Sequence, residues 1–439
     1  MSYNAYITTL KNVRKHPNAD RLQLGDCFGN TVCVNLDYTD GMLGVYFPTD
    51  GQLSTEFAEY NNLLRKKDDI GNSIGGYMDP IKRNVTAIRL RGEKSDGLFL
   101  PLTCVEYTGV DLSTLEVGMA FTVLNGHEIC QKYIPRHNPS RQNVAAGNRT
   151  RKKKVNIAPM FAEHADTEQL AYNLSAFRPG DEIEITLKMH GTSQRTGHLP
   201  VLKGYKRTFW DWLFRREGTP QYEYGYVSGT RRVVLENYEG GFYGDNSFRE
   251  QHSKVFEGKL WKGETVYYEV VSYTSTGAPI MGECKTPKEA QEIYGKTTIF
   301  HYGIESPNSE LYVYRMTMTT PDGNVIEYTP DFMRYRCEMM GVKTVPVFCK
   351  GIIPSCTGDP VAIKYGQDAG NWVKELAERY YDGPDPIGKT HVREGVVVRI
   401  LNRPKFTAFK HKNFLFKQIT GIIKEQMSSE TSEDIMQEL

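Results

Sequence analysis

Short alternating stretches of hydrophobic and polar residues dominate the first 130 residues of the chain. The stretches "AYITTL", "NTVCVNL" and "GMLGVYFP" show the period of two that β-strands have when one face of their sheet is buried. Gly, Asp and Asn turns separate them. Helical spacing occurs over residues 55–65, where Phe57, Tyr60 and Leu64 recur on one face. The pattern predicts a small β-barrel that one helix interrupts.

Longer alternating stretches follow from residue 155 onward, and a few helical segments lie between them. This arrangement predicts a larger antiparallel domain and, for the whole chain, the α+β class. The predicted strands cover residues 182–187, 223–228, 265–272, 298–304, 311–319 and 394–401, and the predicted helices cover residues 286–294, 330–340 and 371–381.

Two stretches lack any hydrophobic period and predict the boundaries of the domains. Residues 131–154 contain prolines, a glycine and the basic run "RTRKKK", which is typical of a linker or a basic loop. Residues 421–439 are acidic and are predicted to form a C-terminal tail. The remaining residues divide into a first domain, 1–130, and a second domain, 155–420.

Composition places the chain among ordinary soluble globular proteins, with 39% hydrophobic and 24% charged residues. The eight cysteines form no CxxC pair and no His/Cys cluster at zinc spacing, which favours a reduced compartment without structural zinc. No apolar run approaches the roughly 20 residues that span a bilayer, and the N-terminus lacks a signal peptide. We therefore expect a cytoplasmic protein without a membrane partner.

The stretch "EIEITLKMHGTS" places a lysine, Lys188, at the end of a predicted strand and a glycine, Gly191, in the turn that follows. Burying an unpaired ammonium is costly, so a lysine at this place indicates chemistry. A neutral lysine amine is a nucleophile once its pKa falls from about 10.4, through desolvation or neighbouring positive charge. Taken alone, the stretch is also typical of a surface strand followed by a turn.

Five further segments accompany this one in a fixed order. Together the six resemble motifs I, Ia, III, IIIa, IV and V of the covalent nucleotidyltransferases, the superfamily of ATP-dependent DNA and RNA ligases and GTP-dependent mRNA capping enzymes. The segments are "KMHGTS" (188–193), "VSGTRR" (227–232), "VYYEVV" (266–271), "LYVYRMT" (311–317), "REGVVVRI" (393–400) and "FKHKNFLFK" (409–417).

The resemblance implies a three-step reaction. Lys188 attacks the α-phosphorus of ATP and becomes lysyl-AMP, the AMP passes to the 5′-phosphate of a polynucleotide, and a 3′-hydroxyl displaces it. These in-line phosphoryl transfers require positioning, positive charge and a divalent metal, so the implied cofactors are ATP with Mg²⁺ or Mn²⁺.

Four residues receive catalytic roles from the resemblance. These residues are Lys188, Lys410, Lys412 and Glu394. Lys410 and Lys412 lie two residues apart, so on a strand both side chains project to the same side and face the α-phosphate. Glu394 helps to hold the metal through waters, and Glu269 contacts the ribose or the metal.

The remaining implied contacts are to the nucleotide. His190 and Gly191 belong to the motif around the nucleophile, and Tyr314 stacks on the adenine. Arg231 assists the AMP or the reactive phosphate, although the neighbouring Arg232, or Arg195, could take that role.

Two features favour RNA as the polynucleotide. His190 occupies a position where DNA ligases and capping enzymes commonly have Asp, whereas RNA ligases of the second type show a similar "K-x-H-G-T". In addition, "HPNADRL" (16–22) resembles the signature of OB-fold tRNA-binding modules. An OB domain in front of a nucleotidyltransferase (adenylyltransferase) domain is the architecture of the RNA ligases typified by the Naegleria and Deinococcus enzymes.

The resemblance therefore implies an ATP-dependent RNA ligase that seals 3′-OH/5′-phosphate ends, in particular nicks in duplex RNA or RNA–DNA hybrids, as in RNA repair. We expect it to act as a monomer. The alternatives are a DNA ligase of unusual domain order, a capping-type guanylyltransferase, and a non-catalytic RNA-binding protein on a ligase fold.

One stretch departs from the family pattern. Residues 198–223 form a basic and aromatic insertion between the first two motifs. It either binds RNA by stacking and charge or forms a local hairpin or helix whose Trp210 and Trp212 pack against the domain. Residues 320–392 also contain material without a family counterpart.

Overall fold

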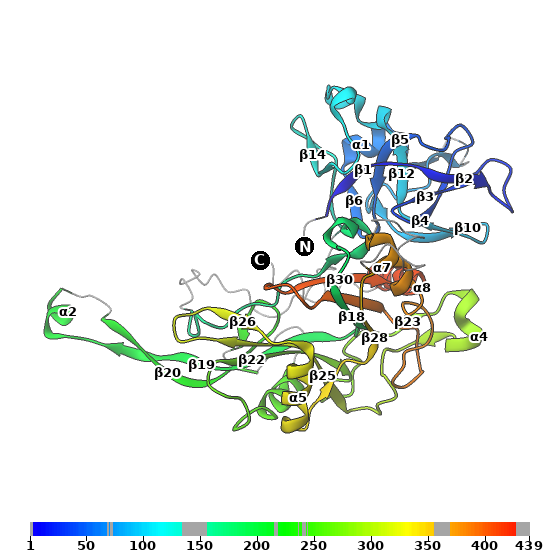
Figure 1. Ribbon diagram of the computed structural model, residues 1–439. Helices are drawn as coiled ribbons and strands as arrows, with labels where there is room; N and C mark the ends of the chain where they lie inside the picture. Colours follow the sequence, from blue (N-terminus) through cyan, green and yellow to red (C-terminus); the bar gives the residue numbers. More distant parts are fainter. Residues whose placement is uncertain are drawn as a thin grey trace. The chain divides into compact units, whose positions relative to one another are not determined.

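The computed structural model describes residues 3–67, 70, 73–133, 156–214, 218–235, 237–238, 243, 245–354 and 369–426. These residues form two compact units (Figure 1). The first unit contains residues 3–133 together with the C-terminal helix α8, Phe414–Gln426, and the second contains residues 156–413. Most of the predicted linker and the tail beyond residue 426 lie outside the described residues.

The first unit consists of short antiparallel strands, as the period-two alternation predicts. Its larger sheets have the strand orders β12-β5-β1-β13, β2-β3-β4 and β16-β6-β9, with the pairs β10-β11, β14-β15 and β7-β8 beside them. No closed barrel joins these described strands. The strands are β1 Ala5–Thr9, β2 Lys11–Lys15, β3 Gln23–Cys27, β4 Asn30–Val34, β5 Leu43–Phe47, β6 Gly51–Leu53, β7 Arg65–Lys67, β8 Ser73–Gly75, β9 Asn84–Val85, β10 Ala87–Leu90, β11 Glu93–Asp96, β12 Leu98–Pro101, β13 Ala120–Phe121, β14 Val123–Leu124, β15 His127–Glu128 and β16 Cys130–Lys132.

The helix of the first half is shorter than predicted. Helix α1, Thr55–Tyr60, starts where the Ser54 hydroxyl accepts a hydrogen bond from the backbone N–H of Phe57. It ends before residue 65 because Asn62 adopts a positive φ of 50°, and Leu64 then forms a β-bridge with Met78. Leu64 is buried in the core of this unit, so its hydrophobic character reflects an extended segment.

Helix α8 is an unexpected part of the first unit. The segment predicted to be motif V continues into this helix, which includes the first six residues of the predicted acidic tail. Its Phe416 and Ile419 are fully buried. Lys417 Nζ lies 2.6 Å from Asp96 Oδ2. The two ends of the described chain therefore build one compact unit.

The second unit contains two mostly antiparallel sheets, so the predicted α+β class with antiparallel sheets is confirmed. The five-stranded sheet has the order β17-β30-β29-β18-β28, and the seven-stranded sheet has the order β21-β20-β19-β22-β25-β26 with β27 beside β25. Only β17–β30 and β25–β27 pair in parallel among these strands. The strands are β17 Glu168–Gln169, β18 Glu182–Leu187, β19 Thr192–Lys206, β20 Thr219–Gly229, β21 Val234–Leu235, β22 Glu264–Ser272, β25 Ser309–Thr319, β26 Val325–Glu327, β27 Lys343–Thr344, β28 Val347–Ile352, β29 Gly395–Ile400 and β30 Thr407–Lys412, with the pair β23 Cys284–Lys285 and β24 Thr297–Thr298.

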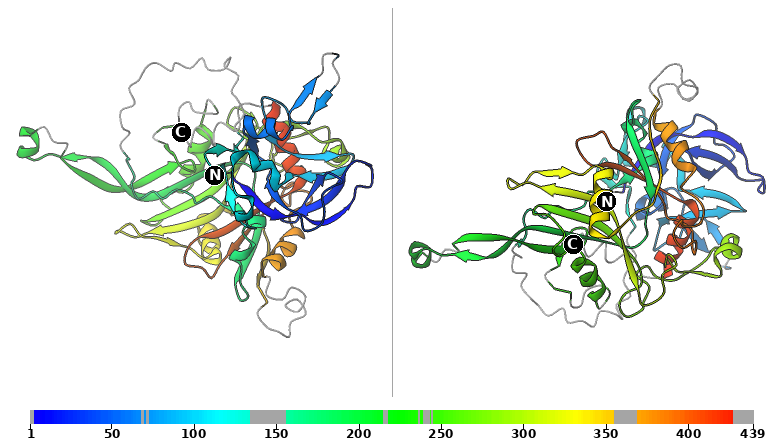
Figure 2. Two further views of the ribbon diagram at one scale, coloured as in Figure 1. Left: turned by 90° about the horizontal axis from the view of Figure 1, so that it is seen from above. Right: turned by 60° about the horizontal axis from the view of Figure 1, so that its bottom comes forward.

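Helices cover one face of each sheet in this unit (Figure 2). Helices α3, Ser247–Lys254, and α5, Pro330–Met340, pack on the seven-stranded sheet, where Phe248 and Met333 meet Tyr268 of β22. Helix α7, Ala369–Glu378, packs on the five-stranded sheet, where Val373 meets Val396. The short helices α2, Phe209–Leu213, and α4, Gln291–Tyr294, lie outside these layers.

Agreement with the predicted elements varies along this unit. Strand β18 and helix α5 have the predicted bounds. The predicted strand 298–304 is wrong, because only Thr297–Thr298 pairs as a strand. The predicted helix 286–294 is helical from Lys288, as a 3-10 turn over Lys288–Ala290 followed by α4. Helix α3 was not predicted because its sequence "SFREQHSK" is short and polar.

The insertion at 198–223 forms the outer part of the β19–β20 hairpin, with α2 at its end. The hairpin and helix that one interpretation predicted are therefore present. The prediction that the tryptophans pack against the domain is wrong, because Trp210 and Trp212 are 63% and 67% exposed.

A buried ion pair fixes α5 on the seven-stranded sheet and gives a first testable prediction. Arg336 of α5 donates two hydrogen bonds to Glu264 of β22, at 2.8 Å and 2.7 Å, and both side chains are buried. Glu264→Ala would leave the guanidinium buried without its counter-charge, so we expect unfolding free energy to fall by about 3–5 kcal/mol. Urea unfolding measures this change.

The matched control is Glu250→Ala in the exposed pair of Glu250 with Lys254 on α3. An exposed pair four residues apart contributes only about 0.3–0.5 kcal/mol. Equal losses for the two variants would contradict the prediction.

Candidate active site

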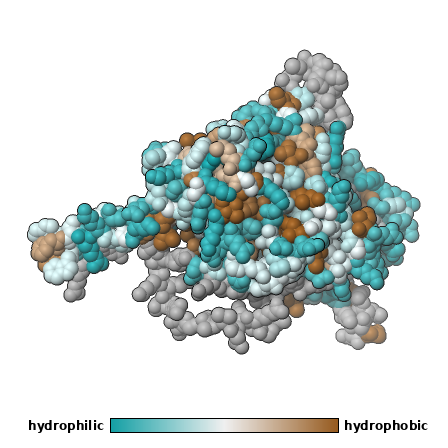
Figure 3. All heavy atoms as spheres, turned by 90° about the horizontal axis from the view of Figure 1, so that it is seen from below, coloured by the Kyte–Doolittle hydropathy of each residue, from teal (hydrophilic) through white to brown (hydrophobic). Residues whose placement is uncertain are grey.

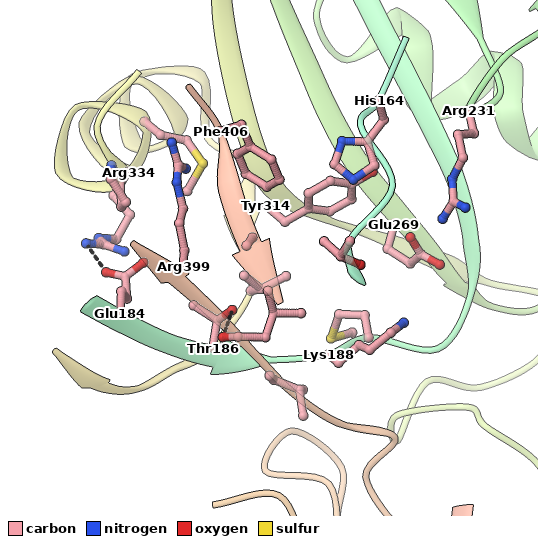
Figure 4. A pocket seen from close by; sticks show the side chains of 18 residues that line it. His164, Glu184, Thr186, Lys188, Arg231, Glu269, Tyr314, Arg334, Arg399 and Phe406 are labelled. Atoms are coloured by element: carbon pink, nitrogen blue, oxygen red, sulfur yellow. Dashed lines mark hydrogen bonds and ion pairs between the residues drawn. The ribbon is translucent and has the colours of Figure 1, made fainter. Parts of the chain in front are cut away.

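A pocket opens between the two sheets of the second unit, and Pro330, Met333 and Arg334 of α5 also line it (Figure 4). Lys188, Glu269 and Arg231 lie on one side of this pocket and Glu184, Arg334 and Arg399 on the other, with His164, Tyr314 and Phe406 between them. The empty space, including the open mouth, is about 820 Å³.

The alternation of β18 explains why Lys188 points into the pocket. Ile183 and Ile185 face the core under α7, so Glu184 and Thr186 face the opposite side and line the pocket. Lys188 follows two residues later, and its backbone N–H still bonds to the carbonyl of Gly395 at 3.0 Å. The strand thus continues long enough to place the lysine on the pocket side.

The Lys188 side chain belongs to a charged cluster around Glu394. Glu394 Oε1 lies 2.9 Å from Lys188 Nζ and 3.2 Å from Lys412 Nζ. His190 Nδ1 lies 3.6 Å from the other oxygen, Oε2. Glu394 is only 3% exposed. The structure therefore brings together four residues that the sequence places up to 224 positions apart, between Lys188 and Lys412.

The cluster determines the protonation of its members. Burial would raise the pKa of the Glu394 carboxyl, but Lys188 and Lys412 beside it hold that pKa well below its usual range. Burial lowers the pKa of the His190 imidazole, an effect that Glu394 partly offsets. A carboxylate beside a neutral imidazole is therefore the resting state at neutral pH.

Lys410 and Lys412 lie on β30, directly opposite Val397 and Gly395 of β29. Both side chains are on one side of the strand, as the spacing predicts. Lys410 is 5% exposed, and burial together with the charges of Lys412 and Lys188 lowers its pKa to about 7. At physiological pH this lysine is therefore close to its midpoint of protonation.

The turn after Lys188 connects the two sheets. Residues 188–191 join β18 of the five-stranded sheet to β19 of the seven-stranded sheet. The backbone N–H of His190 donates a 2.7 Å hydrogen bond to the Tyr302 hydroxyl. A Cβ atom at Gly191 would lie 2.3 Å from the carbonyl oxygen of Val270 on β22. The glycine thus permits close contact with a neighbouring strand.

This contact gives a second prediction. In Gly191→Ala the new methyl would meet the Val270 carbonyl and, at 3.1 Å, Cγ of Glu269. The turn must shift, so we expect a loss of about 1–3 kcal/mol in unfolding free energy, which urea unfolding measures.

Gly204→Ala on the same strand is the control, because a Cβ there has no atom within 4 Å. If both variants behaved like the parent chain, the turn would not need its glycine.

Glu269 and Tyr314 come from neighbouring strands of the seven-stranded sheet. Glu269 of β22 pairs with Ser193 of β19, and the Ser193 hydroxyl lies 3.0 Å from the hydroxyl of Tyr314 on β25. Burial raises the pKa of Tyr314, so its phenol stays neutral. Both side chains line the pocket with Lys188, as expected for residues that contact one ligand.

The three arginines considered for the nucleotide differ in their surroundings. The guanidinium of Arg195 is buried and donates to the carbonyls of Phe161, Thr230 and Arg232, so it supports the fold. Arg231 lines the pocket, and its Nη1 lies 2.9 Å from Asp166. Arg232 contacts the same carboxylate at 3.1 Å.

His164 lines the pocket but was not predicted. Its ring makes edge contacts with Tyr314 at 5.0 Å and Phe406 at 5.7 Å between centroids, and Nδ1 lies 3.3 Å from Nη1 of Arg315. Burial, with Arg315 and Arg231 nearby, lowers the pKa of His164 well below its usual range. His164 and Asp166 lie in "APMFAEHADTEQ", which has no hydrophobic period, so the sequence carries no signal for them.

The acidic groups suit a divalent cation that binds together with phosphates. Within the described residues, no three His, Cys, Asp or Glu side chains form a ready metal cage. Magnesium is usually held by one or two carboxylates, waters and substrate phosphates. Glu394 Oε2 accepts no hydrogen bond within the described part of the chain and is therefore available to such an ion or its waters.

Comparisons with known proteins find similarity in structure but not in sequence. No family model matches the chain, and no curated protein matches it. Mutants of the Naegleria gruberi RNA ligase match in two solved states, without ligand (TM-score 0.54, 16% identity, 95% of this chain and 98% of that chain) and with ATP and Mn (0.53, 15%, 94% and 98%). The same enzyme with PPi gives a TM-score of 0.54 at 16% identity, over 96% of this chain and 98% of that chain. This chain therefore shares the fold of the Naegleria gruberi RNA ligase over nearly its whole length.

Proposed function

We propose that the protein is an ATP-dependent RNA ligase that acts through a lysyl-AMP intermediate. The observation that carries this proposal is the position of Lys188, which ends β18 at the pocket and pairs with a buried carboxylate, Glu394. The order of the six motifs and the fold shared with the Naegleria gruberi RNA ligase support it. A module that only binds RNA would have no need of this cluster.

In the first step Lys188 Nζ, having lost its proton, attacks the α-phosphorus of ATP. A P–N bond forms, the P–O bond to the β-phosphate breaks, and pyrophosphate leaves. In the second step an oxygen of the RNA 5′-phosphate attacks the same phosphorus and releases Lys188. In the third step the 3′-hydroxyl attacks the 5′-phosphate, a phosphodiester forms, and AMP leaves.

The chain's residues divide these tasks. Tyr314, His164 and Phe406 would enclose the adenine, and Glu269 would contact the ribose. Lys410 and Lys412 would face the α-phosphate, where fixed positive charge stabilises the transition state. Glu394 would hold a Mg²⁺ or Mn²⁺ ion, with Glu269 as a second carboxylate, and the ion supplies further positive charge to the phosphates.

Arg231 fits the role of the arginine that assists AMP or the reactive phosphate. It lines the pocket beside Lys188, and Asp166 orients it. His190 and Gly191 would set the path of the backbone beside the nucleophile.

The first unit would bind the RNA. We propose that it is an OB-fold domain, because its short antiparallel strands begin with the "HPNADRL" segment. His16 of this segment is fully buried, and its Nε2 lies 3.1 Å from the carbonyl of Leu90, so its role is structural. We further propose that the protein is a monomer and seals 3′-OH/5′-phosphate nicks in duplex RNA or RNA–DNA hybrids.

The test is incubation with labelled ATP and Mg²⁺ or Mn²⁺, followed by nicked substrates. We expect a labelled protein, an acid-labile P–N bond and transfer of the label to RNA 5′-phosphate ends. No adduct with either metal would refute the proposal. A label from GTP in place of ATP would indicate a guanylyltransferase instead. Sealing of nicks whose 3′ end is deoxyribose as fast as ribose would indicate a DNA ligase.

A further inference from the structure

The outer part of the β19–β20 hairpin forms an arm that projects from the second unit (Figures 1 and 2). We define the arm as residues 198–226, of which residues 198–214 and 218–226 are described. At its base Leu199 and Val227 are buried against Phe161. Beyond Leu202 and Tyr222, which lie opposite each other, most described side chains are exposed.

Aromatic side chains line one face of this arm. Tyr226, Tyr224 and Tyr222 follow one another at two-residue spacing on β20, opposite His198, Pro200 and Leu202 of β19. Paired residues and every second residue point to the same face of a sheet, so the three tyrosines form a ladder. Tyr205, opposite Pro220, extends this ladder toward the tip. The four tyrosines are 37–42% exposed.

The tip of the arm adds a cluster of larger aromatic rings. Phe209, Trp210, Trp212 and Phe214 are 60–67% exposed and contact one another, with Trp210 and Phe214 nearly parallel at 15°. Figure 3 shows a patch of apolar colour among paler residues at this tip, next to a hydrophilic stretch of the arm. A capping box between Thr208 and Asp211 fixes the short helix that presents the rings.

The charge of the aromatic face favours an anionic partner. The strand residues on this face include no Asp or Glu, because Glu223 lies opposite Val201 and points to the other face. Lys262 Nζ lies 5.2 Å from the centroid of the Tyr224 ring. Lys203 occupies a bulge beside Leu202. Exposed rings with lysines beside them are the elements of single-stranded nucleic-acid sites.

We propose that the arm binds a single-stranded segment of RNA by stacking bases on its tyrosine ladder and its tip. This proposal rests on the proposed function, since the RNA would be the substrate of the ligase. Neighbouring ladder residues are about 7 Å apart along the strand, whereas bases in a duplex strand are only 3.4 Å apart. The ladder therefore suits bases that are already separated from one another.

The proposed RNA site on the arm lies far from the pocket that contains Lys188. Lys206 lies fourteen residues beyond Thr192, the start of β19, which corresponds to roughly 45 Å along the strand. The ladder also shares its face with Gln194 and Thr196, opposite to the face where Ser193 and Glu269 meet the pocket. The arm would thus hold an unpaired extension of the RNA, distant from the ends that are joined.

Fluorescence anisotropy with the full chain tests the proposal. The probe is a labelled single-stranded RNA of about 20 nucleotides, longer than the site of one nucleic-acid domain, with a 5′-hydroxyl so that it cannot be ligated. We expect Trp210→Ala with Trp212→Ala, and separately Tyr222→Ala with Tyr224→Ala, to weaken binding by about tenfold or more. Binding of a blunt RNA duplex of the same length should change less than about twofold.

Two further variants keep the test interpretable. Phe332→Ala with Tyr335→Ala removes exposed aromatic residues of α5 and should leave the affinity for RNA unchanged. Replacing residues 203–221 by Asn-Gly joins the paired Leu202 and Tyr222 through a two-residue turn. This shortened arm should also lose about tenfold or more in affinity, and it avoids any misfolding of the tip.

An unchanged RNA affinity in the ladder, tip and shortened-arm variants overturns the proposal. Loss of binding to phosphatidylserine vesicles, with RNA affinity retained, would assign the tip to a membrane surface instead. Labelling with ATP separates the two proposals. If no protein–AMP adduct forms but RNA binding depends on the arm, the ligase assignment fails and the arm site stands.

Discussion

Lys188→Arg should abolish the covalent attachment of AMP while leaving the protein folded. The arginine keeps a positive charge beside Glu394, whose oxygen lies 2.9 Å from Lys188 Nζ in the parent chain. A guanidinium has a pKa above about 12, so it does not lose the proton that a nucleophilic nitrogen must lose. We expect labelling from ATP to fall by about 10³-fold or more, as when an enzyme loses its nucleophile.

The measurement is the rate of label transfer from ATP to protein, with thermal unfolding of the same sample as a check on folding. Lys343→Arg, at an exposed position paired with Glu310, is the matched control and should label normally. Labelling of the Lys188 variant at the parent rate would show that another residue carries the AMP. We also expect Lys188→Ala to remain unlabelled, since alanine has no nitrogen to attack.

Lys410→Met should stabilise the second unit at neutral pH and impair adenylylation. The folded chain holds the pKa of Lys410 at about 7, against 10.5 for an ordinary lysine. Between these two values the unfolded chain binds more protons than the folded chain, so the stability of the parent chain increases with pH. The destabilising effect is complete below pH 7 and disappears as the pH approaches 10.5. Methionine removes it.

Urea unfolding across pH 7 to 10 tests this sign. Relative to the variant, the parent chain should gain up to about 1.4 kcal/mol per pH unit in this range, because the buried groups that both chains share cancel in the difference. Lys285→Met, at an exposed position, should keep the slope of the parent chain. Equal slopes in the parent chain and the Lys410 variant would mean that Lys410 titrates normally.

The same substitution should lower the rate of adenylylation, although it raises the stability of the chain. Lys410 would face the α-phosphate, and removing one preorganised positive or donor group at a transition state costs about 10²–10³ in rate. We expect the Lys410 variant to be more stable and slower by that factor. A variant that labels at the parent rate would remove Lys410 from the proposed machinery.

The sequence predicted correctly those elements in which the hydrophobic pattern and the residues at the two ends indicate the same bounds. Helix α5 has the predicted bounds because Thr329 caps its start, Pro330 occupies its first position and Gly341 adopts a positive φ at its end. Strand β18 was predicted because its alternation continues up to Lys188. Where such signals were weak, as in the polar helix α3, the prediction failed.

Features that depend on contacts between distant parts of the chain could not be predicted from the sequence. The pKa of Lys410 follows from burial and from the approach of Lys412 and Lys188, which strands β30 and β18 of the five-stranded sheet bring together. His164 reaches the pocket from a segment without periodicity. The six motifs indicate a chemistry for Lys188 only through resemblance, since spacing alone does not predict which side chains meet.

Helix α8 completes the unit that the N-terminal strands begin, and this affects when that unit can fold during synthesis. Its buried Phe416 and Ile419 belong to the compact unit that begins with β1, although 280 residues of the chain are synthesised between residues 133 and 414. Domains generally fold as they emerge during translation. The first unit of this protein must instead wait for α8 to leave the ribosome, so a fragment that ends at Asn413 would expose the surface that α8 covers.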